Sequence, residues 1–525
     1  MSMKLKNRRS SIITAGLALV VITAGCSQGG TNSPAKDSAA STAAATKEKA
    51  SGAASTKKIA IEYFAGATVP MLPPKEEDQI MKKINETVNV DLKMTIMTST
   101  DAKNKLNVRI AGGDVPDIMN LPYRDYLEFS KRGLLLDLSP YKDQLKDMQQ
   151  QLGDSWDDAA IGGKLYGIKN TANMGPRYRT YWIRQDWLNK LGLKAPTTLD
   201  ELLKVAEAFT FKDPDGNGKQ DTYGITGNGM AGFGPIFGAF GVPMTITDDL
   251  RGEFYVENGK VQNSLYAPGM KEALTYINKL ISAGVVEPEM VASKEAQVRS
   301  SAYQGKVGIV FLQWPSVVKD EFMKEWKSIN PNADWVQVAA IQGPYGRSNN
   351  AWDVAASTVT AVSQTLAKNP EKLERTLQLL KYMGSAEGYR LGSFGIEGKH
   401  YNLQNNKVVP TELMAKEGDL FFPYQFYGRN DETYLPVKFE KQIKWIDYSF
   451  NEPHTKVYTG GVDYPAGFNI SDANRYIQEE LIKFAYGKTT VGQYDQFISK
   501  LEQTFKYKDY MNSAEQYFKE QRLIQ

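Results

Sequence analysis

The chain has 525 residues, with 63 lysines and arginines against 60 aspartates and glutamates, and a formal net charge of +3. Four of the basic residues and none of the acidic ones lie in residues 1–25, so the rest of the chain is close to neutral. A neutral chain without basic clusters does not fit binding to nucleic acid, and we exclude that class of function.

Residues 1–25 have the layout of a secretory signal peptide. A basic stretch at 4–9 precedes an apolar run at 12–24. This run is shorter than the roughly 20 residues that a membrane-spanning helix needs. We therefore expect export, followed by removal of residues 1–25.

The only cysteine of the chain, Cys26, follows the sequence ITAG. This stretch resembles a lipobox, although Thr23 stands where leucine is usual. We interpret Cys26 as a lipidation site; the alternative is an ordinary signal peptide that contains a cysteine near its end. Residues 26–58 are mostly Ser, Thr, Ala, Gly and Lys, a composition typical of a flexible linker. Together these features predict a lipid-anchored protein on the extracellular face of the cell membrane.

From residue 59 on, apolar residues alternate between the spacing of strands and the spacing of helices. Ile80, Ile84 and Val88, for example, recur every four residues, which indicates one face of a helix. In chain order the pattern predicts a strand at 59–64, a helix from about 75, a strand at 90–96, a helix at 102–111 and a strand at 115–119. This rhythm is typical of a layered α/β sheet with helical crossovers.

The middle and the end of the chain continue in the same style. Thr198 and Glu201 form a capping-box pattern that opens a helix. The other predicted elements are strands at 178–184 and 306–312, helices starting at 186 and covering 270–283, a helix ending at Gly384, and helices from about 472.

Residues 213–221 read DPDGNGKQD, which matches the start of an EF-hand calcium loop. Oxygen-bearing side chains alternate along the loop, and Gly218 at the sixth position permits the sharp turn that lets them converge. Gly224 replaces the glutamate of the twelfth position, so we expect a static calcium site rather than a switching EF-hand; the alternative is a metal-free turn. The predicted ligands are the side chains of Asp213, Asp215, Asn217 and Asp221 and the backbone carbonyl of Lys219.

Signals for catalysis are missing from the sequence. The two histidines, His400 and His454, lie outside any HExxH motif, which argues against a histidine-dependent triad or a zinc site. No spacing among the carboxylates marks a glycosidase pair. We therefore do not expect an enzyme.

Several short segments together resemble one protein family, the extracellular solute-binding lipoproteins of carbohydrate ABC importers, in the large branch near the alginate-oligosaccharide-binding proteins. The segments are AGGDVPDI (111–118), LLDLSPY (135–141), GKLYGI (163–168), IRQDWLNKLGLKAPTTLDEL (183–202), the calcium loop, GKVGI (305–309) and FGIEGKHY (394–401). Thr222 departs from the pattern, because related calcium loops often have glutamate there.

The resemblance implies a two-lobed α/β fold of the periplasmic-binding-protein type (type II), with a hinge between the lobes. It places residues 59–170 and 352–400 in the first lobe and 180–348 and 401–525 in the second, with crossings near 169–179 and 349–353. It also implies a monomeric, non-catalytic receptor that captures an oligosaccharide and delivers it to ABC permease subunits. The alternatives are a cell-surface glycosidase or lyase, and a sensor or peptide-binding relative of the same fold.

Ligands of open α/β sheets lie beyond the carboxyl ends of the strands. Aromatic rings there would stack on sugar faces, and arginine or asparagine would bind hydroxyl groups or a uronate. The alternative for each residue is a role in the core or on the surface. The candidate substrate-binding residues are Tyr63, Phe64, Asn120, Tyr123, Arg124 and Trp314 after strands, and Arg177 and Trp352 in the crossings.

Overall fold

The computed structural model describes residues 57–67, 72–148, 159–170, 175–245 and 251–525. The predicted signal peptide and Cys26 lie outside these residues, as do the linker up to residue 56 and positions 171–174 of the first crossing. Residues Thr56–Gln525 form one compact unit.

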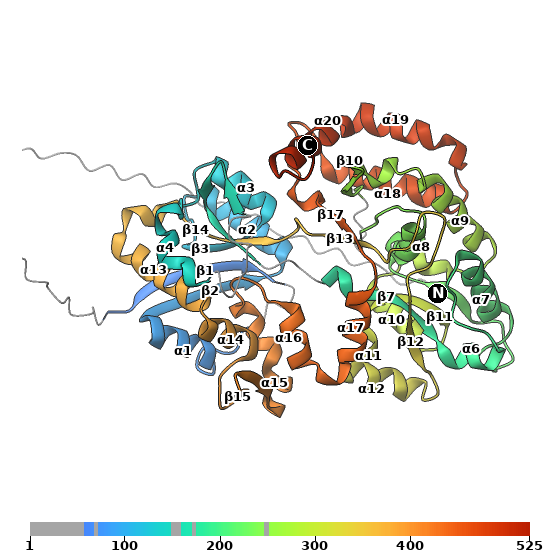
Figure 1. The fold of residues 1–525 in the computed structure, drawn as a ribbon, viewed down its shortest axis with the longest axis horizontal. Helices are drawn as coiled ribbons and strands as arrows, with labels where there is room; N and C mark the ends of the chain where they lie inside the picture. Colours follow the sequence, from blue (N-terminus) through green and yellow to red (C-terminus); the bar gives the residue numbers. More distant parts are fainter. Residues whose placement is uncertain (1–56, 68–71, 149–158, 171–174, 246–250) are drawn as a thin grey trace, which may run out of the picture. The chain divides into compact units, whose positions relative to one another are not determined.

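The first sheet has the strand order β2-β1-β3-β14-β6 (Figure 1). Its strands β1, β2 and β3 are parallel, whereas β14 is antiparallel to both of its neighbours. Helices α1 and α2 are the crossovers that the sequence predicted. The bounds are β1 (Ile59–Gly66), α1 (Gln79–Val88), β2 (Val90–Met97), α2 (Ser99–Ala111), β3 (Ile118–Pro122), β6 (Gly167–Lys169) and β14 (Thr358–Val362).

Two boundaries in this region differ from the prediction. Helix α1 begins at Gln79 rather than near 75, because the carboxylate of Asp78 accepts a hydrogen bond from the backbone N–H of Met81 at 2.9 Å and caps the helix. Strand β3 begins three residues later than expected, after Pro116, which has no N–H to offer to a neighbouring strand.

The second sheet has the order β12-β7-β11-β8. Strand β7 pairs antiparallel with β11 and β12, and β11 pairs parallel with β8. All six residues of β7 are buried, so both faces of this sheet are covered. The bounds are β7 (Arg179–Arg184), α7 (Leu199–Phe211), β8 (Tyr223–Thr226), β11 (Val307–Gln313) and β12 (Trp335–Val338).

We call the first sheet with its helices the first lobe, and the second sheet with its helices the second lobe. The chain leaves the first sheet after β6 and returns to it in β14. On the way back, β13 (Ala351–Asp353) pairs in parallel with β17 (Thr455–Val457), which comes from a later part of the chain. These connections give the two-lobed α/β fold that the sequence predicted.

The segment around residues 424–434 lies against the first lobe, although the prediction assigned 401–525 to the second. Phe426 stacks on Tyr63 of β1, and Tyr434 stacks on Phe394 at the end of α14. The Tyr427 hydroxyl donates to the Leu380 carbonyl at 3.1 Å. Aromatic contacts between residues so far apart leave no periodic signal in the sequence, whereas the C-terminal helices α18, α19 and α20 join the core of the second lobe as expected.

The remaining helices and strands complete the two lobes and their connections. Their bounds are α3 (Tyr123–Lys131), α4 (Lys142–Leu145), β4 (Ala160–Ile161), β5 (Lys164–Leu165), α6 (Gln185–Leu191), α8 (Gly234–Ala239), β9 (Phe254–Glu257), β10 (Lys260–Asn263), α9 (Met270–Ser282), α10 (Glu295–Tyr303), α11 (Pro315–Val318), α12 (Asp320–Ile329), α13 (Pro370–Met383), α14 (Ala386–Phe394), β15 (Tyr401–Gln404), β16 (Lys407–Pro410), α15 (Glu412–Glu417), α16 (Asp431–Lys438), α17 (Ile443–Asn451), α18 (Ile470–Ala485), α19 (Tyr494–Phe505) and α20 (Tyr507–Glu520).

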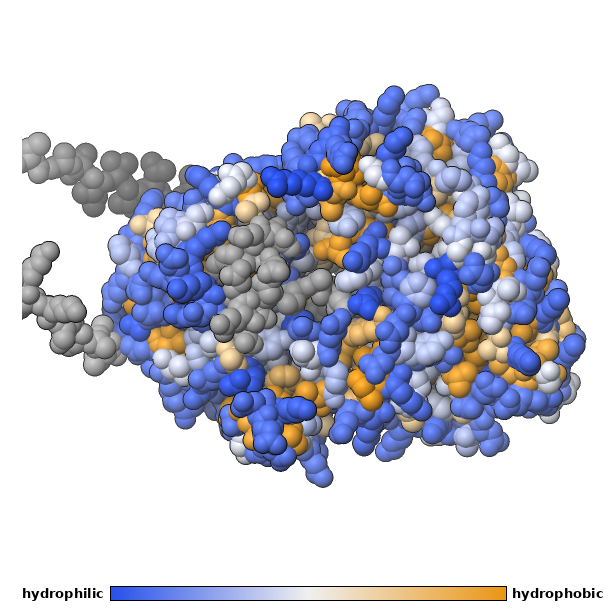
Figure 2. Space-filling model, viewed as in Figure 1, coloured by the Kyte–Doolittle hydropathy of each residue, from blue (hydrophilic) through white to orange (hydrophobic). Residues whose placement is uncertain are grey.

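Hydrophilic residues cover most of the face seen in Figure 2, and hydrophobic residues occur between them in small groups. Among the described residues, the large hydrophobic side chains that stay exposed are scattered single ones, with Val108 the most exposed at 74%. None of the helices in this part of the chain combines the length and the apolar character needed to cross a membrane.

Candidate functional site

Tyr63 and Phe64 lie within β1 rather than after it, because the strand continues to Gly66, and both side chains are part of the core. Tyr63 is 2% exposed and stacks on Phe426 with ring centroids 4.0 Å apart and planes 3° apart. Its burial raises the pKa of the Tyr63 hydroxyl. Phe64 is buried as well, with the Arg109 guanidinium 5.7 Å from the ring centroid. Neither ring offers a face to a ligand in this structure.

Asn120, in the middle of β3, belongs to a row of hydrogen-bonded polar side chains that extends across β3, β14 and the residue after β6. Its side-chain amide donates to the Thr360 hydroxyl at 3.1 Å and reaches the Phe426 carbonyl at 3.5 Å. Farther along the same row, the Asn170 amide donates to the Thr358 hydroxyl at 2.8 Å. These groups largely satisfy each other, which explains how polar side chains are accommodated in a covered sheet.

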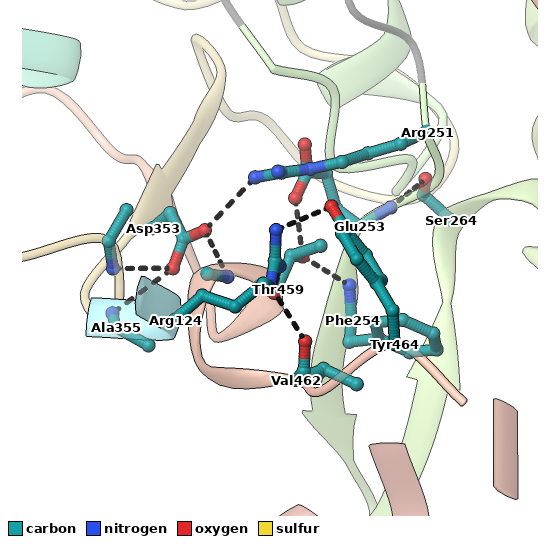
Figure 3. Close-up of polar contacts among 12 residues, drawn as sticks. Arg124, Arg251, Glu253, Phe254, Ser264, Asp353, Ala355, Thr459, Val462 and Tyr464 are labelled. Atoms are coloured by element: carbon teal, nitrogen blue, oxygen red, sulfur yellow. Dashed lines mark hydrogen bonds and ion pairs between the residues drawn. The ribbon is translucent and has the colours of Figure 1, made fainter. Parts of the chain in front are cut away.

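Tyr123 and Arg124 begin α3, directly after β3. Tyr123 is buried, with the Lys169 ammonium 5.8 Å from its ring centroid. Arg124 reaches the second lobe, where its guanidinium lies 3.8 Å from the ring centroid of Tyr464 (Figure 3). Its donors contact the carbonyls of Thr459 and Val462 at 3.4 and 3.3 Å. The guanidinium group of Arg124 therefore contacts other residues of the protein in this structure.

Arg177 and Trp352, from the first and the return crossing, are brought together. The Arg177 guanidinium lies 5.1 Å from the Trp352 ring and 5.0 Å from the Phe450 ring, measured to the centroids. Lys456 lies 5.8 Å from the Trp352 ring, because β17 places it opposite Trp352 in the strand pair. We call Arg177, Trp352, Phe450 and Lys456 the crossing cluster.

The crossing cluster is partly open to solvent. The Arg177 side chain is 18% exposed, and its Nη1 atom lies 3.9 Å from Oε1 of Glu432. Burial lowers the pKa of Arg177, and the charge of Glu432 opposes this shift. A cavity of about 210 Å³ borders Arg177 and Phe450. An arginine beside an accessible aromatic face combines hydrogen-bond donors with a stacking surface. Phe450 and Lys456 were not predicted, because they come from α17 and from β17, the strand that pairs with β13, and both segments are distant from Arg177 in the sequence.

Trp314, after β11, is 1% exposed and packs edge-on against Phe439 with ring centroids 5.1 Å apart. Its indole N–H is buried and makes no hydrogen bond in the structure. Trp314 therefore belongs to the core.

A polar cluster at the carboxyl end of β11 escaped the sequence analysis. The Glu295 carboxylate accepts hydrogen bonds from Arg179 at 2.7 Å, from Gln313 at 2.8 Å and from Ser316 at 2.7 Å. Burial raises the pKa of Glu295, but Arg179 and these hydrogen bonds outweigh it and leave the pKa below its usual value. Gln313 directly follows the predicted strand at 306–312, so the rule that suggested Trp314 could also have suggested Gln313.

In the 213–221 loop the predicted oxygen side chains converge. The Asp213 carboxylate accepts backbone N–H bonds from Gly216 and Asn217 at 3.0 Å and from Gly218 at 3.1 Å. The Asn217 side-chain amide donates to Asp215 at 2.8 Å and to Asp221 at 3.1 Å. The glycine at 218 has φ +77°, as the sharp turn requires.

The donor chemistry of this loop suits calcium, but its present arrangement is that of a hydrogen-bonded turn. Burial and the charges of Asp221 and Asp213 raise the pKa of Asp215, which is the behaviour of crowded carboxylates without a cation. The Asn217 amide nitrogen fills the space between Asp215 and Asp221. In the described part of the chain, no three His, Cys, Asp or Glu side chains are arranged to hold a metal ion.

The sequence matches a family model described as bacterial extracellular solute-binding protein over residues 73–390. Lipoprotein LipO of Bacillus subtilis (strain 168) is 25% identical over 419 residues, which cover 79% of this chain and 78% of LipO. The polygalacturonan/rhamnogalacturonan-binding protein YtcQ of the same organism is 25% identical over 443 residues, or 82% and 86% of the two chains. The fructooligosaccharide ABC transporter substrate-binding protein FusA of Streptococcus pneumoniae serotype 4 is 23% identical over 508 residues, or 87% and 89%.

Solved structures share the fold. An HMO-binding, ABC-transporter-associated solute-binding protein from Bifidobacterium longum infantis has a TM-score of 0.70 at 17% identity, covering 88% of this chain and 98% of that one. The alginate-binding protein AlgQ2 without calcium ion has a TM-score of 0.64 at 17% identity, covering 88% and 98%. An EF-hand mutant of S. pneumoniae FusA with fructo-nystose has a TM-score of 0.64 at 18% identity, covering 88% and 99%.

Proposed function

Since the chain belongs to the bacterial extracellular solute-binding proteins, we propose that it captures an oligosaccharide between its two lobes and delivers it to the permease of an ABC transporter. The family match over residues 73–390 is the observation that carries this proposal. Sugar as the ligand class is supported by relatives whose names specify a polygalacturonan/rhamnogalacturonan and a fructooligosaccharide.

The crossing cluster is the part of the predicted site that fits this role. Trp352 and Phe450 offer ring surfaces on which a sugar could stack. The Arg177 guanidinium lies beside both rings and donates one hydrogen bond to the Phe450 carbonyl, and its other N–H groups could bind hydroxyl or carboxylate oxygens. Because these residues lie where the chain passes between the lobes, a ligand bound there would contact both lobes when they close.

The proposal is tested by titrating the purified protein with a panel of oligosaccharides in a calorimeter. Trp352→Ala is expected to weaken binding about tenfold, because an aromatic stacking contact contributes about 1.5 kcal/mol. The matched control is Tyr345→Ala, which removes an aromatic side chain that is 48% exposed and lies outside the crossing cluster. Turnover of any glycan would favour the glycosidase or lyase alternative, and binding of peptides alone would favour the peptide-binding one.

We also propose that the 213–221 loop binds a structural calcium ion. Asp213, Asp215, Asn217 and Asp221 would supply side-chain oxygens and Lys219 its carbonyl, and the ion would neutralise the crowded carboxylates. Rotation of the Asn217 amide would place its oxygen, instead of its nitrogen, between Asp215 and Asp221, where the ion would bind. Among the proteins of similar fold, AlgQ2 without calcium ion and the EF-hand mutant of FusA support this proposal.

Finally, we propose that the chain is exported, loses residues 1–25 and is lipidated at Cys26, so that it stays at the outer face of the membrane. The name of the relative LipO supports this location. Replacement of Cys26 by serine is expected to release the protein from the membrane fraction and to abolish labelling with a palmitate analogue. Retention of the label in Cys26→Ser would contradict lipidation at this residue.

A further inference from the structure

The Arg124 side chain of helix α3, in the first lobe, contacts the segment 459–464 of the second lobe at three positions. The Arg124 guanidinium donates to the Tyr464 hydroxyl at 2.5 Å, and its other nitrogens contact the carbonyls of Val462 and Thr459 (Figure 3). The same group stacks on the Tyr464 ring. Partners that lie 335 to 340 residues away in the sequence make this a long-range tie.

The segment that receives Arg124 is itself held firmly on its other side. The Thr459 hydroxyl donates to the buried Glu253 carboxylate at 2.5 Å and accepts the backbone N–H of Phe254 at 2.9 Å. The Gly460 N–H donates to the Asp353 carboxylate at 2.6 Å. Asp353 belongs to β13, the return crossing, and also accepts the N–H of Ala355 at 3.0 Å.

These contacts join α3, the 459–464 segment and the return crossing into one chain of hydrogen bonds. Arg124 does not belong to the crossing cluster, and its donors face protein acceptors rather than a ligand. A guanidinium group suits this position, because it spreads several donors in one plane and stacks on an aromatic ring, which lysine cannot reproduce.

We propose that Arg124 is a positioning residue that latches the first lobe to the second and thereby sets the range of angles between them. The latch deepens the proposed function, because capture between lobes depends on that angle, but its test requires no ligand. The neighbouring ion pair between Lys131 and Asp463 joins the same two elements, yet its side chains are 61% and 45% exposed, so it contributes little.

The test measures distances between spin labels on the two lobes, in a full chain whose Cys26 is replaced by serine. Labels at Val108 in the first lobe and Ile329 in the second use exposed positions outside the latch. Arg124→Ala is expected to broaden or shift the distance distribution. Arg124→Lys should restore it only in part, and Lys131→Ala, the matched control, should leave it unchanged.

An Arg124→Ala distribution identical to that of the unsubstituted protein would overturn the latch. An equal change in Lys131→Ala would overturn it as well, because general weakening of the interface would then explain both results. If Arg124→Ala does not fold, the same measurement is made on Arg124→Gln, which keeps the first three carbons of the side chain but removes the guanidinium group. Absence of glycan binding with a clear Arg124 effect would remove the proposed function and leave the latch standing.

Discussion

Two carboxylates in different acidic regions, Asp213 and Asp353, have pKa values that are shifted in opposite directions. In the 213–221 loop, partial loss of water raises the pKa of Asp213, but its hydrogen bonds with Asp215 and with backbone N–H groups lower it below the usual value. In the return crossing, burial and the charge of Glu253 raise the pKa of Asp353 to about 6. Arg251 and the N–H groups of Gly460 and Ala355 act in the opposite direction but do not outweigh them.

The difference teaches that the immediate surroundings of a carboxylate, and not its membership of an acidic cluster, decide the direction of its pKa shift. Asp213 lies at the surface and is surrounded by donors from its own loop. Asp353 is half-buried, and the charge of Glu253 acts on it; its donors are nearby N–H groups together with Arg251 and Gly460, which are distant in the chain. This region contains its own cation, Arg251, 3.4 Å from Asp353.

The largest effect is expected when this internal cation is removed. Arg251→Met leaves the buried Glu253 and the half-buried Asp353 without a compensating charge and should lower the free energy of unfolding by about 3 kcal/mol. Urea denaturation measures the loss. Arg475→Met, at a position where the side chain is 69% exposed, is the control and should change little. An unchanged midpoint for Arg251→Met would show that the two acids do not depend on Arg251.

Removal of calcium is expected to have the next largest effect. An ion present at 100 times its dissociation constant stabilises the folded state by about 2.7 kcal/mol, so chelation should lower the melting temperature accordingly. Asp215→Asn, which removes one of the converging carboxylates, should make the protein insensitive to the chelator. A melting temperature that does not respond to chelation in the unsubstituted protein would argue for the metal-free turn.

The pH dependence of stability should distinguish the two regions. Because the pKa of Asp353 is raised from 3.8 to about 6 by folding, its stabilising contribution is complete below pH 3.8 and is lost as the pH rises through 6. Glu253→Gln removes the charge that helps to raise this pKa, so the loss should occur at lower pH. Melting temperatures between pH 4 and pH 8 check this, and identical profiles for both proteins would contradict the coupling.

The smallest effect is expected at the exposed pair of Lys131 and Asp463. Lys131→Ala should cost less than about 1 kcal/mol, because water and salt screen charges at the surface. Denaturation at low and high salt measures the difference. A loss as large as that of Arg251→Met would show that exposure does not separate the two kinds of ion pair.

Features encoded over short stretches could be predicted from the sequence. The parallel strands β1 and β2, the helices between them and the convergence of the 213–221 loop follow from local spacing and from turn residues. The pairing of Arg177 with Trp352 was within reach because both lie in crossings that the family resemblance implied.

Contacts between distant segments could not be predicted. Arg124 follows strand β3 and Tyr63 lies within β1, and Tyr464 and Phe426 pack against them from more than 300 residues away in the sequence. Trp314 is likewise covered by Phe439. One sequence shows where a side chain leaves its strand, but it does not show which distant side chain packs against it.

The position of β14 in the first sheet has a consequence for the order of folding. This strand lies between β3 and β6, but residues 358–362 follow the whole second sheet in the chain. A chain that emerges from its N-terminus therefore holds an incomplete first sheet, with the edge of β3 open to wrong partners, until synthesis has passed residue 362. The four strands of the second sheet lie between residues 179 and 338, so this sheet is complete earlier, and the sheet that begins the folded region is the last to finish.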